Sequence, residues 1–248
     1  MKRLLLTAAL AVSSVAANAA TTELCGVDSK YDISLDSNRL LFEKSGIQPA
    51  TVEMRHGRLL VDGREIALSE EDRTRVAKYE ATVRALVPQA KAIARDASDI
   101  AFTAVAEVAV AFAGDASASS TRSRLDEIRS RVRDRIDAAF DKRPWHDDEF
   151  DDMVESTLKE LLPVIIGEVA GKAVAMALSG DEKGAQELEA RAEKLKGDIE
   201  RRINTQTQQL AARAAALCPM VAQLGAIEGS LELRLDGTRL KLLEVDWK

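Results

Sequence analysis

One segment of the chain concentrates the side chains that chemistry uses most often. In RPWHDDEFDD a histidine precedes closely spaced acidic residues, and the candidate metal ligands are His146, Asp147, Asp148, Asp151 and Asp152. Carboxylates four residues apart share one face of a helix, where their oxygens suit Ca²⁺ or Mg²⁺. One hypothesis is therefore a metal-dependent hydrolase. The alternative is a helix start whose acidic residues complement the helix dipole. It is favoured because the segment has neither an EF-hand pattern nor a second histidine at zinc spacing.

The two cysteines of the chain, Cys25 and Cys218, are the other candidates for chemistry. Cys25 could carry a lipid, act as a reactive thiol or form half of a disulfide. A lipidation signal has small or aliphatic residues before its cysteine, whereas Glu23 stands two residues before Cys25. Redox pairs usually adopt Cys-x-x-Cys spacing. Two cysteines in an exported chain most simply pair, so we expect a Cys25–Cys218 disulfide.

The first residues have the composition of a secretory signal peptide. Lys2 and Arg3 precede an apolar run over residues 4–15, and Ala-Asn-Ala at residues 17–19 fits the small-x-small cleavage pattern. The run is too short for a transmembrane helix. We therefore expect residues 1–19 to be removed and residues 20–248 to form a single mature, soluble domain.

The composition restricts the classes of function. With 35 basic and 41 acidic side chains the chain has a formal net charge of −6, and aromatic residues make up only 4%. An acidic exported protein is a poor candidate for nucleic-acid binding. The sequence also lacks the Gly-x-Ser-x-Gly, P-loop and dinucleotide-binding glycine patterns. We therefore predict no catalytic residues and no cofactor, and we favour a protein that is not an enzyme.

The hydrophobic periodicity divides the mature chain into strands, helices and strands. Residues 23–68 alternate in the manner of short strands, with turns at His56-Gly57 and Asp62-Gly63. Residues 69–217 follow helical spacing, and a C-terminal hairpin covers residues 230–246. The predicted fold class is α+β. A long helical hairpin or bundle is inserted in a small antiparallel sheet formed by the N- and C-terminal strands.

Four helices are predicted within the middle segment. Ser69 is the N-cap candidate of the first helix, and Pro88 should kink or break that helix. The expected ranges are about 69–113, 119–141, 147–179 and 181–217. The last helix has a nearly heptad apolar stripe and would span roughly 55 Å.

Two of these helices contain unusually apolar segments. IAFTAVAEVAVAFAG carries one charge, and LLPVIIGEVAGKAVAMAL contains a Gly-xxx-Gly step that allows close helix approach. The favoured interpretation is that both segments lie in the core of a bundle. The alternative is a protected apolar groove that meets a membrane, a lipid or a client chain. The candidate groove residues are Phe102, Phe112, Ile165, Ile166, Gly167 and Gly171.

The second predicted helix is rich in arginine. TRSRLDEIRSRVRDRID holds six arginines that flank an apolar stripe from Leu125 to Ile136. Guanidinium groups suit phosphate and carboxylate recognition, so an anionic envelope lipid is one candidate partner. The alternative is a solvated face on which the arginines pair with nearby acidic residues and shield the stripe.

Three features carry a family resemblance. A cysteine follows the signal peptide, the segment DGREIAL at residues 62–68 leads into a helix that contains YEATVRALVPQA, and a long helical middle ends in Cys218. In these features the chain resembles the YggN-like family of uncharacterised exported Gram-negative proteins, from about Glu23 to Met220. The resemblance implies a periplasmic location and supplies no activity or catalytic residues. The C-terminal hairpin, Leu231 to Val245, is expected to lie outside the family.

The sequence therefore favours a non-enzymatic binding or scaffold protein of the cell envelope that uses its long helices. Its partner would be an envelope protein or a lipid, and not nucleic acid. No transmembrane segment is expected in the mature chain. The metal-dependent hydrolase built on His146 and its acidic neighbours is the alternative function.

Overall fold

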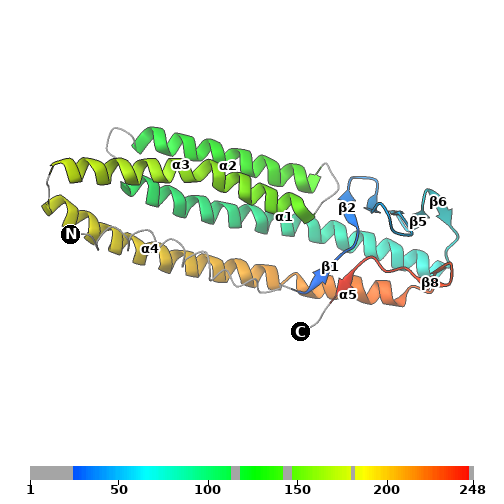
Figure 1. Cartoon of the computed structure of the whole chain (residues 1–248). Helices are drawn as coiled ribbons and strands as arrows, with labels where there is room; N and C mark the ends of the chain where they lie inside the picture. The colour runs from blue at the N-terminus through cyan, green and yellow to red at the C-terminus, as the bar shows by residue number, and fades with distance from the viewer. Residues whose placement is uncertain (1–24, 113–117, 142–146, 180–181, 246–248) are drawn as a thin grey trace.

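The chain folds into a head of short strands and a long helical arm (Figure 1). The computed structural model describes residues 25–112, 118–141, 147–179 and 182–245. One helix, α1 (Glu70–Phe112), begins in the head and runs through the arm, so it links the two parts. The signal peptide predicted for residues 1–19 lies outside the described residues.

Five strands of the head form an antiparallel meander. The N-terminal strands are β1 (Val27–Asp28), β2 (Asp32–Leu35), β3 (Leu40–Glu43), β4 (Thr51–Arg55), β5 (Arg58–Val61) and β6 (Arg64–Ile66). β2 to β6 pair in chain order. The turns His56-Gly57 and Asp62-Gly63 have positive φ at both residues, as expected for the hairpin turns predicted from the sequence. A Cβ at Gly57 would also lie 3.1 Å from the Arg73 carbonyl oxygen, so the close approach requires glycine.

The C-terminal segment returns to the head. α5 (Cys218–Ser230) is followed by β7 (Arg234–Leu235), β8 (Thr238–Arg239) and β9 (Glu244–Val245). β9 pairs antiparallel with β1, whereas β7 and β8 form their own hairpin. The two ends of the described chain therefore meet in the head. This confirms the α+β prediction, with N- and C-terminal strands around a helical insertion.

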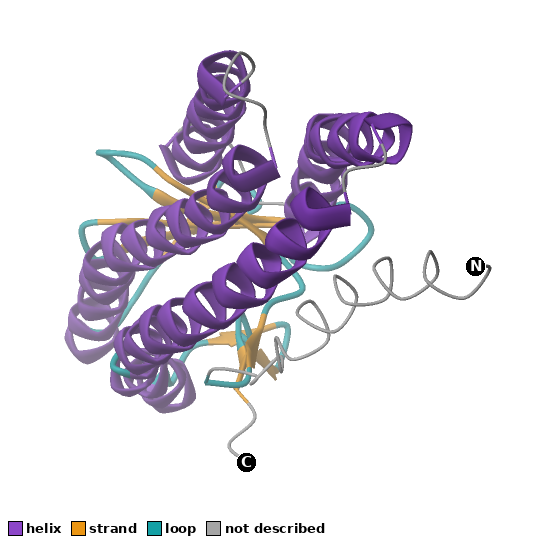
Figure 2. Cartoon of the chain, turned by 90° about the vertical axis from the view of Figure 1, so that its left-hand side faces the viewer, coloured by secondary structure: helices purple, strands orange, loops and turns teal. Residues whose placement is uncertain are grey.

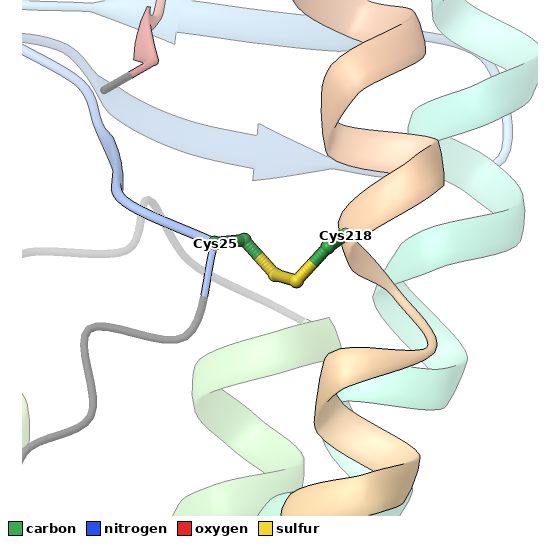
Figure 3. The surroundings of a disulfide bond; sticks show 2 residues. All are labelled: Cys25 and Cys218. Atoms are coloured by element: carbon green, nitrogen blue, oxygen red, sulfur yellow. A yellow bond between two sulfur atoms is a disulfide. The ribbon is translucent and has the colours of Figure 1, made fainter. Parts of the chain in front are cut away.

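A disulfide fixes this meeting of the ends (Figure 3). Cys25 precedes β1 and Cys218 begins α5, and their Cα atoms lie 5.1 Å apart. The bond joins residues that are 193 positions apart in the sequence. The predicted Cys25–Cys218 pairing is confirmed, and it is compatible with an exported protein.

The head has its own apolar core. Side chains of β3, β4 and β5 pack against the first turns of α1 and against α5. Within this core Phe42 makes edge-to-face contacts with both Tyr31 and Tyr79, and each pair of ring centroids lies 6.2 Å apart. The largest fully buried members are Leu40, Phe42, Val52, Met54, Leu59, Val76, Tyr79 and Leu242.

The arm contains four long helices. Besides α1 they are α2 (Ala118–Asp141), α3 (Asp147–Ser179) and α4 (Glu182–Ala215), and α1 contacts each of the other three. Figure 2, which looks along the arm, shows the strands of the head behind these helices. A second apolar core fills the space between α1, α2 and α3. Its buried members are Phe102, Ala109, Leu125, Ile128, Val132, Ile136, Leu161 and Val164. None of the described members of this core comes from α4.

The ranges predicted for the four long helices are confirmed to within two residues. Ser69 caps α1, because its hydroxyl accepts the N–H of Asp72 at 3.1 Å. Pro88 lies inside α1 without ending it, since α1 is packed on both sides of Pro88, in the head and in the arm. The helical range expected from the sequence ends at residue 217 and does not include α5, because a proline such as Pro219 commonly follows the end of a helix. Proline also suits the first turn of a helix, and Pro219 occupies that position in α5.

One helical stretch among the described residues passes a composition test for a membrane span. Within Ala192–Ser230 an 18-residue window has a mean hydropathy of 1.5. A core helix of a soluble protein passes the same test. In this stretch the α5 residues Val221, Leu224 and Ile227 are buried in the head.

Candidate binding seam of the helical arm

A cavity of about 420 Å³ lies between α1, α2 and α4. This volume is within the range of about 300–1,000 Å³ that is usual for ligand sites. α1 contributes most of its apolar lining, and α2 and α4 contribute one leucine each. The apolar lining residues are Phe102, Ala106, Val110, Ala111, Leu125 and Leu195. The cavity therefore offers a surface on which an apolar chain could lie.

A second cavity of about 300 Å³ follows along α1 and α4 and shares Thr103 with the first. Most of its lining residues have polar side chains, although their apolar atoms supply more of its wall than their polar atoms do. The lining residues are Asp96, Asp99, Ile100, Thr103, Gln206, Gln209, Leu210 and Arg213. We call the two cavities together the α1–α4 seam. One end of the seam is apolar, and the other end presents two side-chain amides that donate and accept hydrogen bonds.

Two ion pairs bind α4 to α1 at the seam. Arg202 donates to the Glu107 carboxylate, and Arg213 donates to the Asp96 carboxylate. The hydrogen bond to Glu107 raises the pKa of the Arg202 guanidinium. The Nε of Arg202 is buried and has no partner among the described residues. Polar contacts thus hold α4 along the seam.

The rim of the first cavity carries two further charges. Arg122 and Asp126 of α2 both line the cavity, and both side chains are exposed. They lie four residues apart, which is about one helical turn. Because their charges are opposite, the rim gives the cavity no net preference for an anion.

Other arginines of α2 pair with a neighbouring helix. The side chains of Arg129 and Arg133 lie 2.9 and 3.1 Å from the Asp99 carboxylate of α1. These pairs are partly exposed to solvent. They support the interpretation of this face of α2 as a solvated face with ion pairs rather than as an anion site.

Among the described residues, the head contains three buried carboxylates, of which Asp72 in the first turn of α1 is 3% exposed. It accepts the backbone N–H groups of Glu232 and Leu233 at 3.1 and 3.0 Å. Its carboxylate also lies 2.8 Å from the Arg75 guanidinium. Burial opposes ionisation, but these hydrogen bonds lower the pKa of Asp72 on balance. Asp72 therefore ties the segment before β7 to α1.

Glu80 is the second buried carboxylate and is also 3% exposed. It accepts the backbone N–H of His56 in the β4–β5 turn at 2.6 Å, and it pairs with Arg84 at 2.7 Å. A buried backbone donor in a turn needs such a partner. His56 is thus a turn residue, as the sequence indicated.

Glu228 of α5 is the third, at 9% exposed. It accepts the N–H groups of Leu242 and Leu243 at 3.0 and 3.2 Å. Burial raises the pKa of Glu228 to about 6, and the two hydrogen bonds offset part of this rise. Burial and the nearby Glu228 charge also raise the pKa of Tyr79, whose hydroxyl has no partner among the described residues. Because all three carboxylates bind backbone, we assign them a structural role.

The structure places the residues of the predicted apolar groove in different surroundings. Phe102 lines the α1–α4 seam, and Ile165 packs against the arm core. Ile166 and Gly167 are exposed on α3. Of these four residues, only Phe102 lines the seam.

The structure does not describe the side chains of several predicted site residues. They are Phe112, His146, Asp147, Asp148, Asp151 and Gly171. Asp152, the remaining metal candidate, is exposed. Among the residues that the structure describes, no group of three or more histidine, cysteine, aspartate or glutamate side chains could hold a metal ion. The metal-dependent hydrolase stays a prediction.

The sequence reasoning missed a row of exposed apolar side chains on α3. The side chains are spaced four or eight residues apart and are 41% to 59% exposed. We call this row the α3 ridge, and its members are Val154, Leu158, Leu162, Ile166 and Val174. Because each step of four residues turns by about 40° round the axis, the two ends of the ridge face opposite ways, and Leu158, Leu162 and Ile166 in its middle share one face. The i,i+4 spacing was a visible signal. The inner face of the segment is apolar as well, so the spacing alone does not distinguish core residues from surface residues.

Comparison with known proteins supplies a family. The family model described as "Protein of unknown function (DUF2884)" matches residues 25–243. No curated protein and no solved structure matches the chain. The expectation that the hairpin from Leu231 onward lies outside the family was wrong, because the match extends to residue 243. The hairpin segment is bound to the rest of the head through Asp72 and Glu228, so it is an integral part of the fold. The chain belongs to the DUF2884 family of proteins of unknown function.

Proposed function

We propose that the chain is an exported periplasmic protein of the YggN-like kind that binds an amphiphilic envelope molecule and catalyses no reaction. The observation that carries the proposal is the α1–α4 seam, in which an apolar cavity adjoins a polar one at Thr103. The disulfide supports export, because such bonds persist in oxidising compartments. The arm holds the ligand, and the head closes the chain at the base of the arm.

The apolar part of the seam suits the acyl chain of a single-chain amphiphile. Such a chain would cover the partly exposed side chains of Val110, Ala111 and Leu195 on the cavity wall. Removing apolar surface from water contributes about 25 cal/mol per Å² buried, or about 0.8 kcal/mol per methylene group. Burying about ten methylene groups of a longer acyl chain therefore supplies about 8 kcal/mol, which corresponds to binding in the micromolar range before the cost of association.

The polar part suits a neutral or zwitterionic head group. Thr103, Gln206 and Gln209 line it with groups that both donate and accept hydrogen bonds. The charged side chains that line this part, Asp96, Asp99 and Arg213, carry both signs, which favours a head group with both signs over one that is purely anionic. A lysophospholipid with an ethanolamine head has this chemistry.

The test is calorimetric titration and native mass spectrometry of the mature protein with palmitoyl lysophosphatidylethanolamine below its micelle concentration. Ala106→Phe fills the apolar part of the seam and should weaken binding about tenfold or more, because displacing two methylene groups costs about 1.6 kcal/mol. Ala101→Phe, at an exposed position of the same helix, is the matched control and should bind like the parent protein.

A second variant guards against a folding defect, since Ala106 also packs against the arm core. Leu195→Gln changes a half-buried residue of α4 at the cavity and should weaken binding while thermal unfolding stays unchanged. Absence of binding by the parent protein, or equal binding by all variants, contradicts the proposal.

A further inference from the structure

We propose that a second copy of this chain docks on the α3 ridge, so that the protein forms a two-fold dimer through the outer faces of its α3 helices. Among the described residues, only Val27 exposes a large apolar side chain to a similar degree outside this ridge. Contiguous exposed apolar rows mark interaction surfaces. The inference is independent of the amphiphile proposal, because no α3 residue is among the described residues that line the two cavities.

The ridge is not needed for packing within one copy. The opposite side of α3 already packs in the arm core, where Leu161 and Val164 are 6% and 7% exposed. Leu158 and Leu162, by contrast, leave about half of their surface in solvent, at 52% and 51% exposed. A helix with apolar side chains on both sides has an inner partner and an unpartnered outer face.

The row beside the ridge provides a surface that the ridge of another copy can meet. It consists of the residues one position later, Glu155, Lys159, Pro163 and Gly167. A Cβ added at Gly167 would meet no atom within 4 Å, so the helix surface is flat and open there. Ridges of i,i+4 side chains pack into grooves of the same kind on a second helix. The outer face of α3 therefore contains both a ridge and a place to receive one.

This arrangement favours a second copy over an unrelated partner. About a two-fold axis near Leu162, each copy lays the middle of its ridge on the Pro163–Gly167 surface of the other, as an isologous interface requires. The charged half of the neighbouring row, Glu155 and Lys159, then stays at the solvated rim. One α3 supplies both complementary halves, so no further chemistry has to be assumed.

A membrane surface is a poorer occupant of the same face. The charged side chains described beside the ridge, Asp152, Glu155 and Lys159, comprise two acidic groups and one basic group. Helices that lie on membranes carry basic residues on the polar face, because the lipid surface is negative. The whole chain is also acidic, with a formal net charge of −6.

The expected dimer is weak. Two helices that cross bury less surface than the roughly 1,200 Å² that separates stable from transient complexes. We therefore expect a monomer–dimer equilibrium with a dissociation constant in the micromolar range. Sedimentation velocity of the full mature protein over a broad concentration series measures it directly.

The deciding variant is Gly167→Leu. The site is open in one copy, so the helix accommodates leucine, but the added side chain blocks close approach of a second helix. We expect the dimer to weaken at least tenfold while circular dichroism and thermal unfolding stay unchanged. Gly197→Leu on α4 is the matched control, because a Cβ there meets only the end of a flexible arginine at 3.6 Å, and its dimer should match that of the parent protein.

A crosslink sharpens the test, since both native cysteines are already paired. Leu162→Cys should give a disulfide-linked dimer on mild oxidation, because the two-fold axis brings the two copies of this residue together. Glu193→Cys, exposed on α4, should not. A parent protein that stays monomeric at every concentration overturns the proposal, as does a Gly167→Leu protein that dimerises like the parent. Binding of the parent to anionic vesicles without self-association would assign the ridge to lipid and also overturn it.

Discussion

In the head, three carboxylates that are 3% to 9% exposed each accept at least one backbone N–H from a distant part of the chain. In the arm, the two ion pairs that bind α4 leave a third or more of each side chain in solvent. Buried charges that lose a partner cost several kcal/mol, whereas exposed ion pairs contribute about 1 kcal/mol or less. The contacts that close the head are therefore costly to break, whereas the contacts that hold α4 in the arm are not.

The apolar side chains are also packed more tightly in the head than in the arm. Core residues of the head such as Leu40, Val52 and Met54 are completely buried, and a disulfide closes the ends of the chain around them. In the arm the seam between α1 and α4 holds two cavities, and α3 exposes its ridge. Both surfaces to which we assign binding thus lie in the arm. The comparison predicts that equivalent changes in the two parts have unequal effects on stability.

The largest effect is expected from the disulfide. Closing a loop between residues 193 positions apart stabilises the folded chain by up to about 5 kcal/mol in the chain-entropy model. Reduction should therefore shift guanidinium unfolding to much lower denaturant concentration, with loss of the near-ultraviolet signal of the aromatic cluster in the head. The double variant Cys25→Ser, Cys218→Ser is the control and should unfold like the reduced protein with or without reductant. An unchanged midpoint on reduction would show that the head closes without the bond.

The second effect compares two glutamates. Glu80→Ala leaves the His56 N–H without its partner and Arg84 without its counter-ion, in a part of the head where Glu80 is 3% exposed. We expect a loss of about 2–3 kcal/mol in the free energy of unfolding. Glu107→Ala removes an arm carboxylate from its partly exposed pair with Arg202 and should cost less than about 1 kcal/mol. Equal losses, measured by urea unfolding, would contradict the distinction between head and arm.

The third prediction concerns pH. The pKa of Glu228 is raised from 4.5 to about 6 in the folded protein, so the folded state binds the proton before the unfolded state does as the pH falls. As the pH falls from about 7 through the folded value of about 6, this group therefore adds stability, and the gain reaches its full size of about 2 kcal/mol only below the unfolded value of 4.5. Glu228→Gln keeps an acceptor for the Leu242 and Leu243 N–H groups and should remove this gain.

At lower pH the free energy of unfolding should fall again, because a second buried carboxylate is protonated. The pKa of Asp72 is lowered, so its contribution to stability is present above the ordinary value of 3.8 and is lost as the pH falls below it. Urea unfolding as a function of pH should thus show a maximum on the acidic side of neutrality in the parent protein. If the maximum persists in Glu228→Gln, another group carries the raised pKa.

Some features of the head and the arm could be predicted from the sequence, and others could not. The X-Gly turns and the four long helices follow from local rules, because positive φ selects glycine and because caps and periodicity act within a few residues. The Cys25–Cys218 bond followed from export and from there being only two cysteines. These features require no knowledge of the tertiary structure.

The remaining features depend on contacts between distant residues. Burial of the Glu228 carboxylate is tolerated because the N–H groups of Leu242 and Leu243 donate to it. No residue near Glu228 in the sequence indicates these hydrogen bonds. The residues of the seam come from α1, α2 and α4, so only the packing of the helices brings Phe102 next to Leu195. On α3, Leu161 and Leu162 are neighbours of the same type, yet one is buried and the other exposed. Residue type alone does not distinguish them.

The smallest effect is expected at the end of the seam that lies nearer the head. Arg213→Ala removes the ion pair with Asp96 between α4 and α1, in which both side chains are about half exposed. The global free energy of unfolding should fall by less than about 1 kcal/mol, and the difference from the parent should shrink at high salt.

Local opening is the more sensitive measurement for this variant. Because polar contacts such as this one hold α4, hydrogen exchange of α4 amides should become faster, while the amides of β3, β4 and α5 in the head stay as protected as before. Arg75→Ala, which removes a partner of buried Asp72 in the head, is the matched control and should lower protection throughout the head. If losing Arg213 loosened the head as much as α4, the two parts would unfold as one unit. The seam could not then open to admit a ligand while the head stays closed.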